Sequence, residues 1–276
     1  MYSSKVAVVT GGGAGLGREL ALGLAARGAR VAVCDLNGDW ADETAGMVRA
    51  SGGDALSEAV DVGDSAAMGA FAGRVAGHFG AVHQLYNNAG IAIEGKPITR
   101  LADDEIEKVL RVNVWGAFNG TRAFLPLLKD SGDGLLCNIA SLNGMLALGG
   151  AAPYCASKSA VIGLTESVRI EMLQARAPVS VALVLPGGIA TDIARRLPPD
   201  WDDLTPERQA QIKAQIDENY RKYLKMPPEV AARDILKKLA RGRRRITVTP
   251  KAYWLDLLVR AIPAHYPKLV AGAMRG

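Results

Sequence analysis

A tyrosine and a lysine four residues apart, Tyr154 and Lys158, could carry out proton transfer. Tyrosine is a poor base because its ordinary pKa is about 10. A lysine at i+4 on a helix shares its face, and a nearby cation lowers the tyrosine pKa. Tyr154 then serves as general base in alcohol oxidation, or as general acid in ketone reduction. On its own, this spacing would also describe a surface pair.

Ser141 follows an apolar run at residues 135–139 that predicts a strand. A hydroxyl at the carboxyl edge of a parallel sheet lies where ligands bind in α/β proteins. There it can hold a substrate oxygen and stabilise the charge that develops on it. Taken alone, Ser141 could equally be a turn residue.

A glycine-rich turn, TGGGAGLG at residues 10–17, joins the first predicted strand to the first predicted helix. Glycine permits positive φ and lets a pyrophosphate approach the backbone, and the helix N-terminus offers free N–H groups. Such a turn could simply connect a strand to a helix. The acid 20 residues after Gly15, Asp35, favours dinucleotide binding instead.

Asp35 predicts NAD as the cofactor. Its carboxylate can accept hydrogen bonds from the ribose hydroxyls of NAD but repels the 2′-phosphate of NADP. The neighbouring Ala14 and Leu36 add no cation. Arg18 is the nearest residue that could favour NADP, and we interpret it as a solvated helix residue.

The elements that must position these groups alternate between short β-branched runs and helix-length segments. Near-continuous apolar strands separated by helices predict a parallel sheet covered on both faces. The pattern predicts strands at 5–10, 30–35, 82–87, 135–139 and 179–185, with another ending at Asp61. It predicts helices at 15–27, 38–50, 64–79 and 153–175, and helical segments around 102–129.

After residue 185 this alternation stops. Residues 187–226 form an insertion in which Thr205 and Pro206 mark a helix start, and we expect a substrate lid here. A helix at 229–241 and a short strand at 246–249 follow. With no repeat or linker apparent, residues 1–276 are predicted to form one α/β domain.

Taken together, these motifs resemble the short-chain dehydrogenase/reductase (SDR) family over residues 4–190. The likeness rests on TGGGAGLG, the NNAG at 87–90, Asn113, Ser141, YCASK at 154–158 and Pro186-Gly187, in the family's order and spacing. The resemblance implies a Rossmann-type doubly wound sheet of about seven strands. It also implies a reaction that interconverts an alcohol and a ketone by hydride transfer to or from the nicotinamide cofactor. It also implies that Lys158 binds the nicotinamide ribose and that Asn113 holds a water in a proton relay.

The resemblance further implies a cofactor site built mainly from the carboxyl ends of the strands. In it, Asp61 and Val62 contact adenine, although Asp61 could equally cap a strand, and Ile189 and Thr191 hold the nicotinamide carboxamide. The expected set is Gly11, Gly13, Gly15, Leu16, Gly17, Asp35, Leu36, Asp61, Val62, Asn88, Ala89, Gly90, Tyr154, Lys158, Pro186, Gly187, Ile189 and Thr191.

The residues after Ser141 and those at the start of the lid are mostly apolar, which favours a bulky hydrophobic alcohol or ketone. Arg195 and Arg196 could instead engage an acidic group, but we interpret them as solvated. The expected substrate-binding set is Ser141, Asn143, Met145, Leu148, Tyr154, Gly188, Ile193, Leu197 and Trp201.

Composition narrows the class of protein. The 276 residues are 49% hydrophobic and 22% charged, which is typical of a globular chain. Three cysteines without a CxxC pair and three histidines without partners at ligand spacing predict neither a disulfide framework nor a metal site. The first residues carry no signal-peptide pattern and no stretch is long and apolar enough to span a membrane, so we expect a cytoplasmic protein.

The C-terminal part is strongly basic. Residues 233–276 hold 11 Lys or Arg and 2 Asp or Glu, and Trp254, Leu257, Leu258, Ala261 and Ile262 form an apolar helical stripe. We expect this extension, 250–276, to pack over the substrate pocket or against a partner copy. Peripheral membrane contact is the less favoured alternative, and no nucleic-acid motif accompanies the charge. A homodimer or homotetramer is expected.

Three functions remain in competition. The leading one is an NAD-dependent dehydrogenase of secondary alcohols. The second is a ketoreductase that works mainly in the reducing direction, since Tyr154 serves both. The third is a non-catalytic NAD-binding regulator, which would not need the reactive Ser141, Tyr154 and Lys158.

Overall fold

The computed structural model describes residues 1–93, 95–190 and 205–273. Within them a single parallel sheet runs in the order β3-β2-β1-β4-β5-β6-β7. Crossing from β1 to β4 reverses the direction of winding, which is the switch point of a doubly wound sheet. The strands are β1 (Val6–Thr10), β2 (Arg30–Asp35), β3 (Ala55–Ala59), β4 (Gln84–Asn87), β5 (Gly134–Ile139), β6 (Val179–Leu185) and β7 (Arg245–Thr247).

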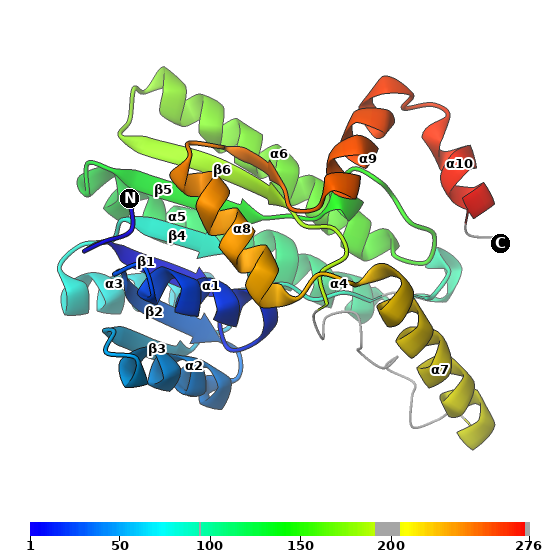
Figure 1. Ribbon diagram of the computed structural model, residues 1–276, viewed down its shortest axis with the longest axis horizontal. Coiled ribbons are helices and arrows are strands. Elements are labelled where there is room, and N and C mark those ends of the chain that lie inside the picture. Colours follow the sequence, from blue (N-terminus) through cyan, green and yellow to red (C-terminus); the bar gives the residue numbers. More distant parts are fainter. Residues whose placement is uncertain (94, 191–204, 274–276) are drawn as a thin grey trace.

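Helices cover both faces of this sheet (Figure 1). The helices are α1 (Gly15–Ala25), α2 (Gly38–Ala50), α3 (Ser65–Phe79), α4 (Asp103–Leu110), α5 (Gly116–Asp130), α6 (Ala152–Gln174), α7 (Pro206–Tyr223), α8 (Pro228–Ala240), α9 (Pro250–Ala261) and α10 (Tyr266–Ala273). The expected doubly wound fold with about seven strands is confirmed.

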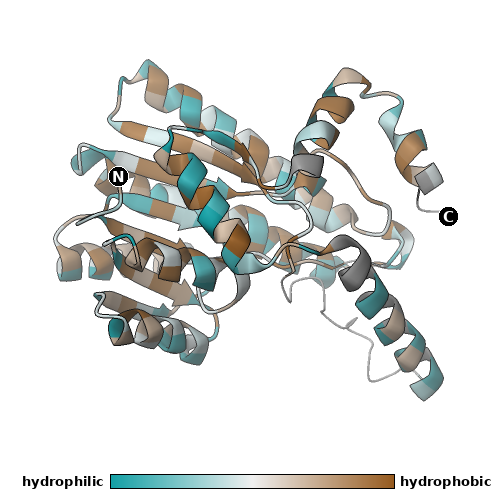
Figure 2. Ribbon diagram, in the orientation of Figure 1, coloured by the Kyte–Doolittle hydropathy of each residue, from teal (hydrophilic) through white to brown (hydrophobic). Residues whose placement is uncertain are grey.

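Two hydrophobic layers hold the sheet because successive strand residues point to opposite faces. In β1, Ala7 and Val9 pack toward α1 and α8, whereas Val6 and Val8 pack toward α3, α5 and α6. The central strands are therefore mostly apolar, and brown prevails in them in Figure 2, whereas the edge strands β3 and β7 hold polar residues. This two-sided burial explains the continuous apolar runs in the sequence.

The helical segments expected around 102–129 are α4 and α5, which a π-helical turn, Arg111–Trp115, joins. Such turns insert one residue into the helical ladder and often lie at functional sites. Here the turn carries Asn113, which is 2% exposed. Side-chain periodicity is too coarse to distinguish this turn from a continuous helix.

The C-terminal segment also differs in detail from its prediction. Strand β7 ends at Thr247 rather than residue 249, because Thr249 caps α9 by accepting a hydrogen bond from the Ala252 N–H at 3.2 Å. A further helix, α10, follows α9 and was not predicted. Within the described ranges, no helix combines the length and apolarity needed to cross a bilayer.

Candidate active site

Tyr154 and Lys158 lie on α6, beside the carboxyl end of β5. The Lys158 Nζ is 5.7 Å from the centroid of the Tyr154 ring. It donates a hydrogen bond of 3.1 Å to the carbonyl oxygen of Ile139, the last residue of β5. The pair predicted from spacing alone is therefore formed, at the sheet edge where ligands bind in this class of fold.

Burial changes the proton affinity of this lysine. Lys158 is 4% exposed, and loss of hydration lowers its pKa to about 8. An ammonium group in this position is stabilised by few partners, so a negative charge on a neighbouring oxygen stabilises it strongly. A tyrosinate at Tyr154 would be such a negative charge.

Asn113 is brought to the same place by the π-helical turn. Its Oδ1 accepts a hydrogen bond from the Ile91 N–H at 2.8 Å, and its Nδ2 donates to the Ile91 carbonyl at 2.9 Å and to the Ser157 Oγ at 2.9 Å. A Cβ on Gly90 would lie 3.2 Å from both the Asn113 Oδ1 and the Lys158 Nζ. Only a residue without a side chain fits comfortably between these two groups.

Ser141 begins the short turn Leu142–Gly144, directly after β5. Its Oγ accepts a hydrogen bond from the Asn143 N–H at 3.1 Å. Because that bond uses an acceptor position, the hydroxyl proton is available to a substrate oxygen. The turn role and the catalytic role, which the sequence left as alternatives, are therefore compatible.

The glycine-rich turn has the shape a dinucleotide requires. Gly11 has φ +60° and Gly15 has φ +53°, a region that glycine adopts readily. A Cβ on Gly11 would lie 2.7 Å from the Ala89 Cα. Helix α1 starts after Ala14, which supplies no side-chain cap, and its first turn holds no acid. The turn therefore fits a pyrophosphate at the first N–H groups of α1.

Asp35, at the end of β2, is held by two backbone donors. Its Oδ2 accepts from the Gly13 N–H at 3.0 Å and its Oδ1 from the Asn37 N–H at 3.1 Å. A carboxylate has about four acceptor positions, so two remain for ribose hydroxyls. The adjacent Leu36 is 75% exposed and adds no charge.

Arg18 is not simply solvated, as the sequence had suggested. Its Nη2 lies 2.6 Å from the Glu43 Oε2, and its Nε donates to the Gly13 carbonyl at 2.9 Å. The guanidinium therefore holds the glycine-rich turn against α2. Its charge is also balanced by Glu43, which matters for cofactor choice.

The residues after β4 form hydrogen bonds with the glycine-rich turn. The Asn88 Nδ2 donates to the carbonyl oxygens of Thr10 and Gly11, both at 3.0 Å, and the Thr10 Oγ1 accepts from the N–H groups of Asn88 and Ala89. Asn88 and Ala89 thus hold the glycine-rich turn in its conformation. Contact between these residues and the cofactor remains a prediction.

Asp61 and Val62 lie beside the same edge. The Asp61 Oδ1 accepts from the Gly63 N–H at 2.8 Å and the Oδ2 pairs with the Arg111 Nη1 at 2.7 Å. The capping role that the sequence left open is present. Val62 is 6% exposed, and its carbonyl oxygen accepts a hydrogen bond from the Asn119 Nδ2. Their contact with adenine also remains a prediction.

The segment after β6 continues the site. The Pro186 carbonyl accepts from the Leu142 N–H at 2.9 Å, which ties it to the turn after Ser141. Gly188 has φ +68°, and Ile189 pairs with Met226 ahead of α8. Of the expected residues, Thr191, Ile193, Leu197 and Trp201 lie outside the described residues.

Comparison with known proteins agrees with this geometry. Residues 5–202 match the family model described as short chain dehydrogenase. The chain is 41% identical over 273 residues to the SadH protein of Mycobacterium tuberculosis, covering 99% of this chain and 96% of that protein. It is 30% identical over 233 residues to levodione reductase of Leifsonia aquatica, covering 84% and 86%. The chain belongs to the short-chain dehydrogenase/reductase family.

A solved structure extends the likeness to three dimensions. The SDR of Burkholderia phymatum, crystallised in complex with NAD, superimposes with a TM-score of 0.85 at 29% identity, covering 95% of this chain and 94% of that one. The present SDR is therefore an oxidoreductase of a nicotinamide-dependent family.

The structure also reveals a contact that spacing could not predict. The Arg245 Nη2 lies 3.0 Å from the Met145 Sδ and 3.0 Å from the Asp256 Oδ1, so β7 links the expected substrate loop to α9. The Asp256 side chain is 4% exposed and also pairs with Arg260 at 2.9 Å. Met145 and Arg245 are 100 residues apart, so no local pattern signals their contact.

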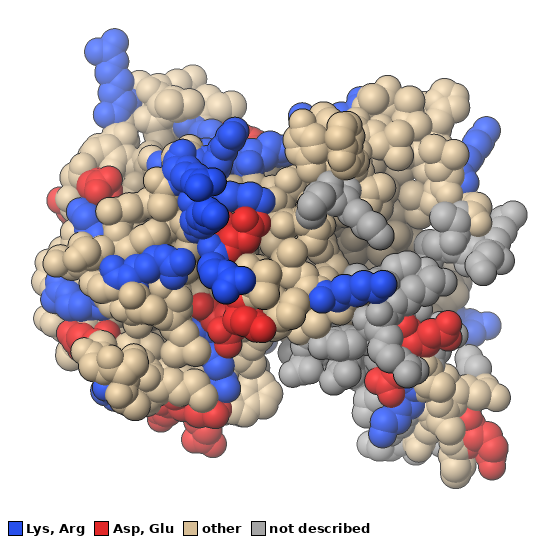
Figure 3. Space-filling view, in the orientation of Figure 1, with Lys and Arg blue, Asp and Glu red and all other residues tan. Residues whose placement is uncertain are grey.

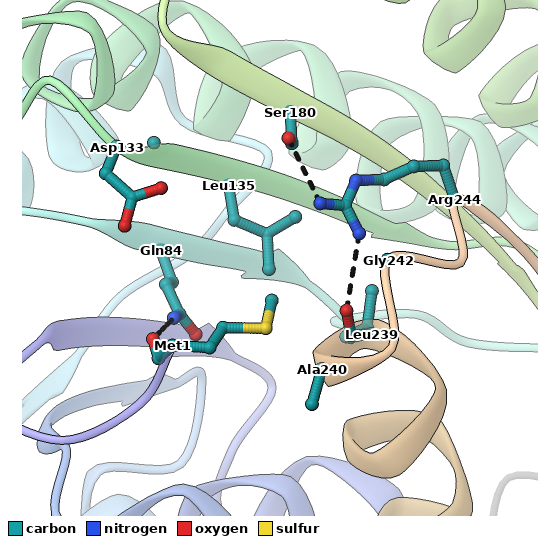
Figure 4. Close-up of a pocket in the computed structure, with 10 residues that line it drawn as sticks. Met1, Gln84, Asp133, Leu135, Ser180, Leu239, Ala240, Gly242 and Arg244 are labelled. Carbon is teal, nitrogen blue, oxygen red and sulfur yellow. Dashed lines mark hydrogen bonds between the residues drawn. The ribbon is translucent and has the colours of Figure 1, made fainter.

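A small cavity of about 160 Å³ lies at the opposite edge of the sheet (Figure 4). It is bordered by the starts of β4, β5 and β6 and by the end of α8. Its polar groups bond to one another: the Arg244 guanidinium reaches the Ser180 Oγ and the Leu239 carbonyl, and the Gln84 Nε2 donates to the Met1 carbonyl. This cavity lies far from Tyr154. Because its polar groups bond to one another, we interpret it as a packing gap in this SDR and not as a binding site.

Replacement of Gly17 by alanine tests the cofactor turn. A Cβ there would overlap the Gly11 carbonyl oxygen and lie 2.5 Å from the Asn88 Nδ2. We expect Gly17→Ala to abolish NADH binding in a fluorescence titration. Gly73→Ala is the matched control, because nothing lies within 4 Å of its Cβ. This variant should bind NADH normally, and its free energy of unfolding should be about 0.5–1 kcal/mol higher. Normal NADH binding by Gly17→Ala would contradict the assigned turn.

Proposed function

We propose that this SDR transfers hydride between NAD(H) and a secondary alcohol or ketone, with Tyr154 as the proton-transfer group. The observation that carries the proposal is the buried Lys158 ammonium, 5.7 Å from the Tyr154 ring. A lysine is rarely buried without a partner of opposite charge, because burial disfavours its charged form. Here the tyrosinate supplies that partner during turnover.

In this proposal each residue has a distinct role. Tyr154 removes the hydroxyl proton from an alcohol, or returns a proton to the oxygen of a ketone. Lys158 lowers the Tyr154 pKa, and Ser141 donates a hydrogen bond to the reacting oxygen. Asn113 forms hydrogen bonds with the Ile91 backbone and would bind a water molecule beside Lys158. The nicotinamide, when bound, accepts or supplies the hydride.

The glycine-rich turn and strand ends would hold the cofactor. The first N–H groups of α1, after Gly13 and Ala14, would bind the pyrophosphate. Asp35 would bind the adenosine ribose and Lys158 the nicotinamide ribose. Pro186, Gly187 and Ile189 would border the nicotinamide.

NAD rather than NADP fits the charges around Asp35. The carboxylate would repel a 2′-phosphate, and the charge of the neighbouring Arg18 is already paired with Glu43 at 2.6 Å. The related SDR crystallised with NAD supports the same choice.

For the substrate we propose a lipophilic secondary alcohol or ketone. Leu142, Met145 and Leu148 follow the catalytic Ser141 and are apolar. The relative named levodione reductase acts, by its name, on a ketone substrate, which suits such a pocket. Direction is set by cofactor ratios, since Tyr154 serves oxidation and reduction alike. A non-catalytic NAD-binding regulator is the second candidate, and the experiment below distinguishes it.

Substitution of Tyr154 by phenylalanine tests the reaction. Purified protein is offered NAD or NADP with secondary alcohols from small aliphatic to aryl, terpenoid and steroid compounds, and absorbance of the reduced cofactor is followed. We expect NAD-linked turnover that falls about 10²–10⁴-fold in Tyr154→Phe because the proton-transfer group is lost. NADH binding should persist in this variant.

Tyr253→Phe is the matched control, because the Tyr253 side chain on α9 is 50% exposed. This variant should show normal turnover. Equal turnover by Tyr154→Phe and the unmodified protein would contradict the proposal. NADH binding without turnover of any compound would favour the regulator. Preferential turnover of small polar hydroxy acids would contradict the lipophilic substrate.

Charge removal around Asp35 tests cofactor choice. We expect Asp35→Ser to raise the NADP-to-NAD ratio of kcat/KM at least ~10-fold, because a like charge beside the 2′-phosphate is lost. Adding Glu43→Gln should raise the ratio further, since Arg18 is released from its 2.6 Å ion pair. Glu171→Gln, an exposed acid on α6, is the control. Equal affinity of the unmodified protein for NADH and NADPH would rule out the assignment.

A further inference from the structure

The end of the chain presents cations and aromatic side chains on one face. Helix α8 buries Ala232, Ile235 and Leu239, so its opposite side faces solvent. That side exposes Arg233, Lys237 and Arg241, which form no ion pair with any other residue in the described ranges. Figure 3 shows Lys and Arg gathered over α8 and the segment after it.

Helix α9 lies beside these cations and leaves its apolar side uncovered. Ala252, Asp256 and Val259 face the protein and are 1%, 3% and 7% exposed. Trp254, the first residue of the apolar stripe predicted from the sequence, is 68% exposed, and Tyr253 beside it is 50% exposed. Their rings meet edge to face with centroids 5.4 Å apart.

A groove of about 650 Å³ separates the two helices. Arg233, Lys237 and the ion-paired Asp234 and Lys238 line its α8 side, and Tyr253 and Trp254 line its α9 side. We call this surface, made of Arg233, Lys237, Arg241, Tyr253 and Trp254, the basic–aromatic face. Cations beside aromatic rings match the boundary between lipid headgroups and acyl chains, where tryptophan and tyrosine gather.

The aromatic side chains are held in place rather than loosely attached. Asp256, on the buried side of α9, pairs with Arg245 at 3.0 Å and with Arg260 at 2.9 Å. The Arg245–Asp256 pair fixes α9 to β7, whereas Arg260 lies on α9 itself, so Tyr253 and Trp254 stay exposed without folding back. A preformed face of this kind loses little conformational entropy when it binds.

We propose that the basic–aromatic face binds membrane surfaces that carry anionic phospholipid. The charge argues against a second copy as the occupant, since the face carries the exposed cations Arg233, Lys237 and Arg241 and two such surfaces repel each other. Exposed apolar side chains on α9 and α10, such as Leu258 at 39% exposure and Leu269 at 54%, suit acyl chains better than a phosphate backbone. The inference does not depend on the proposed reaction.

Vesicle co-sedimentation of the full chain tests this proposal. Vesicles of phosphatidylcholine mixed with phosphatidylglycerol are compared with vesicles of phosphatidylcholine alone. We expect binding to the anionic vesicles only, weakening as salt is raised because exposed charges are screened. Arg233→Glu combined with Lys237→Glu should lower the partition coefficient at least ~10-fold.

Lys108→Glu combined with Lys129→Glu is the matched control, since it makes the same change in net charge at exposed residues of α4 and α5. This control should bind nearly as well as the unmodified chain. A blue shift of tryptophan fluorescence on binding should be lost in Trp254→Ser. Thermal unfolding monitored by circular dichroism checks that every variant is folded.

Three results would overturn the proposal. The first is failure of the full chain to sediment with anionic vesicles. The second is equal loss of binding in the control pair and in the Arg233 and Lys237 pair, which would mean that net charge alone matters. The third is tighter binding to a single-stranded oligonucleotide than to vesicles at the same salt concentration, which would identify the face as a nucleic-acid surface.

Discussion

The active site depends on keeping one ammonium group, that of Lys158, out of water at the edge of the sheet. A buried cation is costly unless its surroundings supply compensating dipoles or charge. Here the Ile139 carbonyl oxygen accepts a hydrogen bond from the ammonium group at 3.1 Å, and the remaining cost appears as a Lys158 pKa lowered to about 8. That cost makes tyrosinate at Tyr154 a favourable neighbour.

Much of the surrounding fold serves to create this position. Strand β5 must end at Ile139 so that its last carbonyl points at α6, and Ser141 must follow directly. Gly90 must lack a side chain, because a Cβ there would lie 3.2 Å from both the Lys158 Nζ and the Asn113 Oδ1. The π-helical turn then brings Asn113 onto the Ile91 backbone.

The sequence was informative wherever the determining contact is local. Two-sided burial gives each strand an apolar run, the phosphate turn needs glycine at Gly11 for its positive φ, and the Tyr154–Lys158 pair lies within one helical turn. These features allowed the sheet, the glycine-rich turn and the helix that carries Tyr154 and Lys158 to be predicted.

Contacts between distant residues could not be predicted in this way. The π-helical turn follows from the tie between Asn113 and Ile91, which amphipathic spacing does not encode. Arg18 was interpreted as solvated, because its partner Glu43 is 25 residues away. Only packing explains why the predicted stripe on α9 leaves Trp254 exposed while Asp256 is buried: Asp256 pairs with Arg245 on β7.

The most direct test of the account is the pH dependence of kcat/KM for alcohol oxidation at saturating NAD, in the unmodified protein and in Lys158→Ala. Oxidation needs deprotonated Tyr154, so the rate should rise with pH, and the neighbouring Lys158 cation should place that rise below the ordinary tyrosine pKa. Without the cation, the rise should move toward the ordinary tyrosine pKa of about 10. A rise at the same pH in both proteins would contradict the claim that Lys158 sets the proton affinity of Tyr154.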